Sequence, residues 1–201
     1  LANNQLTKKI TENARGIDLV VGAKGSPLQL ILCNIFHVDF PTGNIKLAEA
    51  EKIARNRLVK KAIPLALGDS YESFRIIGTN KEYADLYKAE LAKGIWWKSN
   101  LEVTLGANVQ EKTRLQPGDQ FASSHGLTIQ GHAHNEHRYI VTGILKKSNT
   151  VLDNLILTNV ESVWEMHEEQ RETEENHVPE VPSESFIPSR IVPTVAAGDS
   201  L

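Results

Sequence analysis

The chain has 201 residues, a formal net charge of −3 at pH 7 and a single cysteine. Its length is sufficient for one or two compact domains, and 40% hydrophobic residues is an ordinary share for a globular protein. The small negative charge, without a basic stripe carrying aromatic residues, argues against a nucleic-acid surface. One cysteine excludes an internal disulfide.

The apolar residues do not form a membrane-spanning segment. The longest apolar run, residues 28–36, is far shorter than the ~20 residues that a membrane helix needs. No signal peptide is visible, and the sequence begins at Leu1 without a methionine. We therefore expect a fragment of a longer protein, whose remaining parts could include membrane helices.

The first conspicuous segment runs from Gly16 to Ile45. Its apolar run at 17–21 lies between two glycines and predicts a short buried strand. Ser26 and Pro27 then predict the N-cap and first residue of a helix. The apolar residues of this helix are too dense for one face, so we expect burial on most sides; they are Leu28, Leu30, Ile31, Leu32, Ile35 and Phe36. If buried, Leu30 or Leu32 replaced by alanine would cost about 2–5 kcal/mol.

Helical and alternating patterns follow one another along the rest of the chain. Helices are predicted at 47–60, 81–93, 107–115 and 159–168, the last one capped by Asn159. Strands are predicted at 62–67, 71–78, 101–105, 121–129, 138–145 and 152–157, with turns at 68–70 and 116–119. Pro64 predicts that its strand lies at an edge or begins there. The hairpin-like region 120–145 interrupts the alternation, so the predicted fold class is α+β. The acidic, Pro-rich segment 168–201 predicts a mobile tail, at least to about Ser185.

Three parts of the sequence, in this order, resemble one family. The first is DLVVGAKGSPLQLIL at 18–32, followed by FHVD and PTGNI. The second combines the glycine-containing stretches 91–94, 106–109 and 115–119, and the third combines 139–145 with 153–158. Together they cover roughly residues 14–165 and resemble the MacB-like periplasmic core domain. That domain lies between the first two membrane helices of FtsX-type ABC transporter permeases.

The resemblance implies a fold and a function. It implies a porter-like α/β subdomain built from residues 1–80 and 145–201, with an inserted mixed α/β subdomain at 81–144. Residues 3–14 would continue a first membrane helix. The domain would lie on the periplasmic side of the inner membrane, without catalysis of its own, and transmit ATP-driven change to a substrate or partner. Force would enter near the chain ends, so we expect residues 22–42 against the core there.

The implied partners are those of a transporter. They are a separate ABC ATPase subunit and the membrane helices of the same permease. A periplasmic adaptor or lipoprotein could be a further partner, and the full transporter could contain a homodimer. Nucleic acid is not among the implied partners. The turn Gly22 to Ser26 is not a phosphate-binding loop, because it is too short and Gly25 separates Lys24 from Ser26. We therefore expect no ATP binding here, and an ATPase on another chain.

No catalytic constellation is visible. Cys33 lies in the densest apolar run, where burial would raise the pKa of its thiol, so it is predicted to be a core residue. His37 is predicted to be a hydrogen-bonded structural histidine. Ser123-Ser124-His125 lacks the glycines of a nucleophile elbow. Trp96 and Trp97 leave two alternatives: one ring is exposed for a partner, or both pack into the core.

Four of the seven histidines fall within thirteen positions: His125, His132, His134 and His137. Neutral imidazoles suit zinc, nickel or copper, and Glu136 could add an oxygen. The alternative is a solvated polar loop without metal, because no helical framework fixes the geometry. Near the acidic tail, His167 and His177 predict either a weak chelator or a solvated charged loop. The alternative function is therefore a periplasmic zinc-binding protein.

Overall fold

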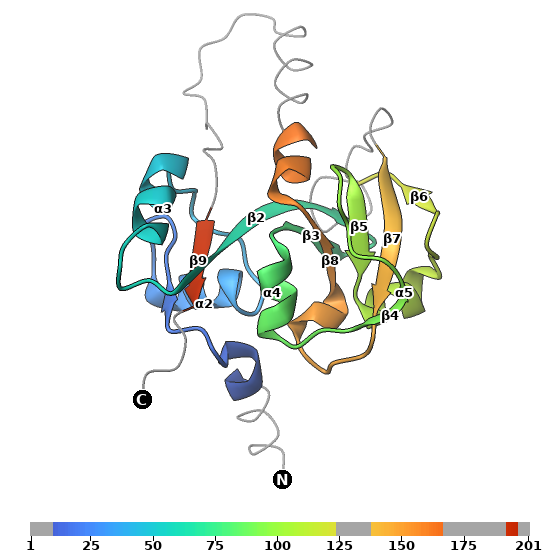
Figure 1. The fold of residues 1–201 in the computed structure, drawn as a ribbon, viewed down its shortest axis with the longest axis horizontal. Helices are drawn as coiled ribbons and strands as arrows, with labels where there is room; N and C mark the ends of the chain where they lie inside the picture. Colours follow the sequence, from blue (N-terminus) through green and yellow to red (C-terminus); the bar gives the residue numbers. More distant parts are fainter. Residues whose placement is uncertain (1–9, 124–137, 167–191, 197–201) are drawn as a thin grey trace, which may run out of the picture.

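The computed structural model describes residues 10–123 and 138–166, and the backbone of residues 192–196. These residues form one mixed sheet with short helices around it (Figure 1). Within the described ranges, no helix is both long and apolar enough to cross a membrane. The predicted combination of helices with a mixed sheet is confirmed.

The sheet holds nine strands among the described residues. Their order is β1 (Leu19–Val20), β9 (Val192–Ala196), β2 (Lys61–Tyr71), β3 (Phe74–Gly78), β8 (Leu155–Thr158), β5 (Glu102–Leu105), β7 (Tyr139–Leu145) and β4 (Leu91–Gly94). The two-residue strand β6 (Gln120–Phe121) also pairs with β7. The pairs β3–β8 and β5–β7 are parallel, and the others are antiparallel.

Strand β2 joins the two ends of the sheet. Its residues 61–65 pair with β9, and its residues 66–71 pair with β3. Pro64 lies opposite Pro193 of β9, and β3 pairs only with later residues of β2, so among the described strands Pro64 is paired on one side, as at an edge. Its carbonyl accepts a hydrogen bond from Thr79 Oγ1 at 2.8 Å. A register shift between residues 67 and 70 replaces the turn predicted there, because the strand continues through an irregularity.

The turn between β2 and β3 consists of Glu72 and Ser73. Both residues have positive φ angles, 46° and 71°, although neither is glycine. Positive φ at both central positions is the geometry of the hairpin turns whose twist matches that of the flanking strands. Without asparagine or glycine, the sequence carried no signal for it.

Several predicted helices are shorter in the structure. They are α2 (Pro27–Asn34), α3 (Leu47–Ala54), α4 (Lys81–Leu86) and α5 (Ala107–Thr113). The strand predicted at 152–157 begins only at Leu155, because the 3₁₀ helix η1 (Val151–Asn154) precedes it. The helix predicted at 81–93 ends because Lys88 adopts a φ of 52°, and the chain then enters β4. Residues 160–166 are helical, and Asn159 Oδ1 accepts the amide of Ser162 at 2.9 Å, as the predicted cap requires.

The hydrophobic core lies between Ile63 and Met166. All buried members of three apolar clusters fall in this range. The largest fully buried side chains include Tyr83, Tyr139 and Leu157. Figure 1 shows α2 and α3 at one end of the molecule, beside β9, and β4, β7 and α5 at the other end.

Helix α2 is far less buried than predicted. Only Cys33 and Asn34 of this helix are buried, whereas Leu28 is 64% exposed and Ile31 41% exposed. The sheet is short next to α2, because β1 has only two residues. It can therefore cover only one side of the helix. The prediction of burial on most sides is wrong.

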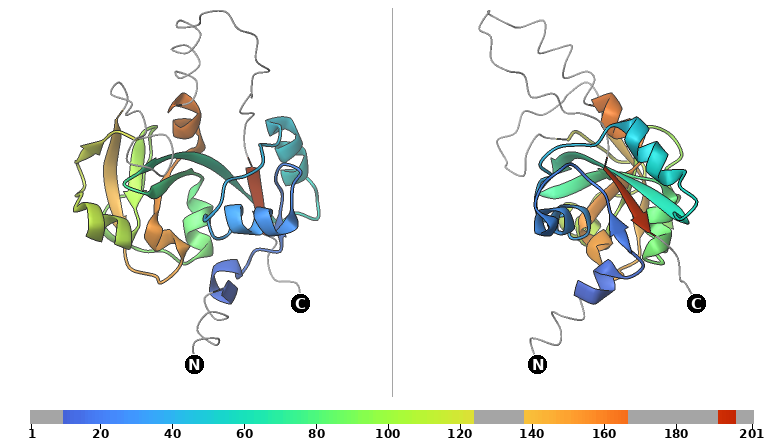
Figure 2. Two further views of the ribbon diagram at one scale, coloured as in Figure 1. Left: turned by 180° about the vertical axis from the view of Figure 1, so that it is seen from behind. Right: turned by 90° about the vertical axis from the view of Figure 1, so that its left-hand side faces the viewer.

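The C-terminal part of the chain contributes a strand. Strand β9 lies between β1 and β2 within the segment predicted as a tail, whereas residues 167–191 lie outside the described part. Leu19 pairs with Val195 in antiparallel direction, so the chain enters β1 at the end where it leaves β9. Figure 2 shows the tip of β9 and the helical residues 10–14 on the same side of the molecule. One continuous sheet runs across both boundaries of the predicted subdomains. The division into two subdomains stays a prediction.

Candidate functional site

The predicted metal ligands lie outside the described residues. His125, His132, His134 and His137, together with Glu136, fall in the undescribed range 124–137, and the tail histidines fall in 167–191. Within the described ranges, no three histidine, cysteine or carboxylate side chains are placed to hold a metal ion. The zinc site therefore stays a prediction.

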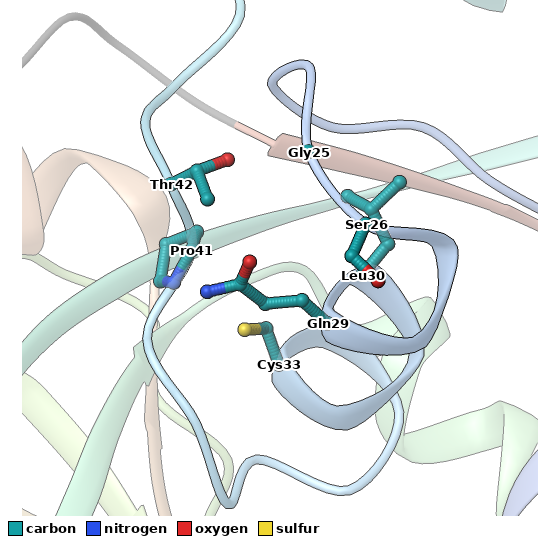
Figure 3. Close-up of a pocket in the computed structure, with 7 residues that line it drawn as sticks. All are labelled: Gly25, Ser26, Gln29, Leu30, Cys33, Pro41 and Thr42. Atoms are coloured by element: carbon teal, nitrogen blue, oxygen red, sulfur yellow. The ribbon is translucent and has the colours of Figure 1, made fainter.

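The glycine-rich turn before α2 packs tightly against residues 41–42. Thr42 Oγ1 donates to the Lys24 carbonyl at 3.2 Å, and a Cβ added to Gly25 would come within 2.8 Å of that hydroxyl oxygen. Figure 3 shows Gln29 and Cys33 of α2 facing this segment across a small gap. The gap measures about 10 Å³, the space of one water molecule, so a phosphate group does not fit there.

Cys33 and His37 have the structural positions that the sequence predicted. Cys33 is fully buried, and burial, with a smaller effect from Asp39, raises the pKa of its thiol. His37 is buried with a φ of 54°, and its Nε2 lies 2.7 Å from the Tyr83 hydroxyl oxygen. Burial and the charge of Arg75 lower the pKa of His37 to about 3. The imidazole is therefore neutral at neutral pH.

A series of contacts leads from His37 to the N-terminal helix. The Tyr83 and Tyr87 rings pack edge to face, with centroids 5.4 Å apart, and Tyr87 Oη donates to the Asn13 carbonyl at 3.0 Å. Burial raises the pKa of Tyr83 well above its usual range and that of Tyr87 to about 12.

His37 Nδ1 is buried without a hydrogen-bond partner among the described residues. A charged ring would carry a proton on this nitrogen with no acceptor for it, near the charge of Arg75. Burial, with a smaller effect from Arg75, therefore lowers the pKa of the ring.

Asn13 connects the N-terminal helix to a second element. Its Oδ1 accepts the backbone amide of Val151 in η1 at 2.9 Å. Nearby, Gly16 has a φ of 78°, and a Cβ there would lie 3.0 Å from Leu86 Cδ1 of α4. We call Asn13, Tyr87 and Val151 the N-terminal junction. It joins residues 10–14 to the end of α4 and to η1.

The sequence did not predict the N-terminal junction. Asn13 stands in a weak helical pattern, and Tyr87 was one of several apolar positions of a predicted helix. Short polar side chains such as asparagine often bond to backbone groups, but their partners cannot be read from the sequence.

For the two tryptophans, the sequence left open whether one ring is exposed or both pack into the core. Trp96 and Trp97 are both partly buried against the first core cluster, with ring centroids 5.6 Å apart.

Comparison with known proteins places this geometry in context. No family model matches the chain, and no curated protein matches it. Among solved structures, the periplasmic region of MacB from Actinobacillus actinomycetemcomitans matches with a TM-score of 0.53 and 15% identity, over 96% of this chain and 82% of that one. The chain has the MacB periplasmic fold. The fold that the sequence resemblance implied is thus confirmed.

Two further structures match less closely. A domain of a putative permease protein from Porphyromonas gingivalis matches at TM-score 0.47 and 13% identity, over 78% of this chain and 63% of that one. The extracellular domain of the noncanonic ABC-type transporter YknZ from Gram-positive bacteria matches with a TM-score of 0.44 and 14% identity, over 70% of this chain and 72% of that one. The MacB-like fold does not by itself identify what this chain contacts.

Proposed function

We propose that this chain is the extracytoplasmic domain of an ABC transporter permease subunit, on the periplasmic side of the inner membrane. The likeness to the MacB periplasmic region over 96% of the chain carries this proposal. The ATPase would be a separate subunit, and the domain would do no chemistry itself. It would pass ATP-driven movement of the membrane helices of the same permease to a substrate or a partner, such as an adaptor or lipoprotein.

The N-terminal junction supports this mechanical role. A membrane helix that continues into residues 10–14 would pull directly on Asn13. From there, one hydrogen bond leads to Tyr87 after α4 and another to Val151 in η1. The Tyr87 ring packs edge to face on Tyr83, whose hydroxyl is hydrogen-bonded to His37 next to α2. Rigid elements joined by such contacts are the physical means by which a displacement at one site reaches another.

The test removes the junction from the working transporter. Asn13→Ala with Tyr87→Phe removes both hydrogen bonds while keeping the packing of the tyrosine ring. Asn100→Ala with Tyr71→Phe is the matched control, because Asn100 hydrogen-bonds to Glu165 and Asn159 and Tyr71 packs against Phe121, away from the junction. Both double variants are made in the permease that contains this chain, reconstituted in vesicles with its ATPase.

We expect the junction variant to hydrolyse ATP but to transport less per ATP hydrolysed, since the helices would move without displacing the domain. The control variant should transport as the wild type does. Unchanged transport by the junction variant would reject this mechanical route. A permease that transports normally after removal of the whole domain would reject the proposed function itself.

Zinc binding is the second candidate function, favoured by the density of histidines at 125–137. Three ligands from one short loop rarely complete the tetrahedral shell of zinc, so His132, His134 and His137 would be joined by His125 or Glu136. Zinc is titrated into the wild type, into His132→Ala/His134→Ala, and into His167→Ala/His177→Ala as a control. One-to-one binding lost only in the first pair, and weakened below about pH 6.5, supports the site. Equal weak binding by all three proteins rejects it.

A further inference from the structure

One surface of the molecule exposes apolar side chains without cover. Leu28 and Ile31 of α2 are exposed, and Val38 and Phe40 after the helix are 67% and 55% exposed. Val38 donates its amide to the Leu32 carbonyl, and the Phe40 carbonyl accepts from Gln29 Nε2, so both are held against the helix. We call Leu28, Ile31, Val38 and Phe40 the α2 face.

The four side chains of the α2 face are themselves uncharged, but charged residues adjoin them. Residues 25–38 contain no aspartate, glutamate, lysine or arginine, whereas the half-buried Asp39 stands between Val38 and Phe40, and the exposed Lys24 precedes the turn. Arg75 lies behind this surface, 94% buried, with its guanidinium 4.2 Å from the centre of the Phe40 ring, and its charge interacts with that of Asp39. The exposed apolar side chains of the α2 face suit a partner that is itself apolar.

The position of α2 selects the partner. Helix α2 contacts β1, and the chain enters β1 at the end where it leaves β9. The tip of β9, the helical residues 10–14 and α2 lie on the same side of the molecule (Figures 1 and 2). If the chain is a permease domain, as proposed above, its two ends continue into membrane helices. This side then faces the lipid.

We propose that the α2 face docks on the bilayer surface, with its aliphatic and aromatic side chains at the boundary between headgroups and acyl chains. This inference rests on the proposed function. The α2 face holds four exposed residues and no lysine or arginine that would attract anionic lipids, so it would bind weakly on its own. Membrane helices on both sides raise its effective concentration at the surface. Weak contacts then suffice to fix the tilt of the domain over the bilayer.

The experiment measures how close α2 comes to lipid. The chain is fused behind a single membrane-spanning helix and reconstituted in vesicles of phosphatidylethanolamine and phosphatidylglycerol. A polarity-sensitive dye is attached through Ser26→Cys at the start of α2 or, as a reference, through Glu111→Cys on α5; both positions are exposed, and Cys33 is fully buried. Quenching by nitroxide groups on the acyl chains reports contact with the bilayer.

Two substitution pairs test whether the side chains cause the contact. Leu28→Ser/Ile31→Ser removes half of the α2 face, whereas Ile95→Ser/Ile140→Ser changes two exposed apolar residues in the other part of the sheet. All four residues are exposed, so both variants should fold, which far-ultraviolet circular dichroism checks. We expect strong quenching at position 26 and little at 111. The α2 pair should lower the docked-to-free ratio about tenfold, because two apolar side chains no longer leave water.

Two results would overturn the docking inference. One is equal quenching at the two dye positions, or quenching at position 26 that the α2 pair leaves unchanged. The other is a concentration-dependent dimer of the soluble chain, seen by sedimentation and abolished by the α2 pair, which would make a second copy the occupant. If docking fails while the junction variant still uncouples transport, this inference falls and the proposed function stands.

Discussion

The two ends of the sheet differ in how they cover their apolar side chains. Six of the nine large hydrophobic residues exposed in the described ranges belong to residues 17–60: Leu19, Leu28, Ile31, Val38, Phe40 and Leu58. Every buried member of the three core clusters lies between residues 63 and 166. We call residues 17–60 with β9 the N-terminal lobe, and residues 61–166 the central region. The central region thus holds the buried apolar clusters, and the N-terminal lobe holds most of the large apolar side chains that are exposed.

Buried polar side chains lie where these regions meet. Three of those that leave an atom without a hydrogen-bond partner in the described ranges are Asn34, His37 and Arg75. Contacts across the boundary include the backbone pairing of β9 with β2, the packing of Leu47 on the third core cluster, the His37–Tyr83 hydrogen bond and the Arg75–Phe40 cation–π contact. The two side-chain contacts of polar groups have defined geometry and therefore restrict the orientation of the lobe.

The largest expected difference is in the cost of truncating an apolar side chain. Leu157→Ala in β8 removes a fully buried side chain and should lower the free energy of unfolding by about 2–5 kcal/mol. Leu30 in α2 is only half-buried, so the earlier expectation of the same cost there is corrected to about 1 kcal/mol. Urea unfolding of both variants measures the difference. Equal losses would mean that the two regions share one core.

The second prediction concerns pH at the boundary. The folded chain holds His37 neutral down to about pH 3, whereas the unfolded chain protonates it near 6.5. Between these values the unfolded state binds more protons, so stability is full above pH 6.5 and falls as the pH is lowered through this window. From pH 7 to pH 5, His37 should lower the free energy of unfolding by about 2 kcal/mol.

The matched variant is His37→Asn, because asparagine tolerates the positive φ of this position. It should be less stable than the wild type at pH 7 through loss of the Tyr83 contact. Its stability should change about 2 kcal/mol less between pH 7 and pH 5. An identical pH dependence in both proteins would show that His37 is protonated in the folded state.

The sequence predicted the central region better than the N-terminal lobe. The strand at 101–105 and the Asn159 cap were confirmed, but Thr104 is as buried as Val103 and Leu105, so the strand is covered on both faces. Helix α2 was placed correctly but its exposure was not. Its burial depends on β9, which comes from the far end of the chain. Apolar density predicts that a segment avoids water, but it does not say whether the cover comes from the chain or from a partner.

The candidate site shows the same limit. Cys33 and His37 were predicted to be structural because apolar neighbours surround them in the sequence. The N-terminal junction was missed, since it joins residues that are 74 and 138 positions apart. Hydrogen bonds of such range leave no periodic pattern.

The smallest expected effect sharpens the link between the lobe and the junction. Tyr87→Phe removes the donor to the Asn13 carbonyl and keeps the ring, at a cost of about 1 kcal/mol. Amide exchange measures the effect across the junction, because Val151 donates its N–H to Asn13, whose position depends on Tyr87.

Tyr71→Phe is the control, since Tyr71 packs against Phe121 at the other end of β2. It should leave the exchange rate of the Val151 amide unchanged. In Tyr87→Phe the Val151 amide should exchange faster, while the Leu157 amide in the central region keeps its rate. Equal exchange of the Val151 amide in the wild type and in Tyr87→Phe would mean that the position of Asn13 does not depend on the Tyr87 hydroxyl.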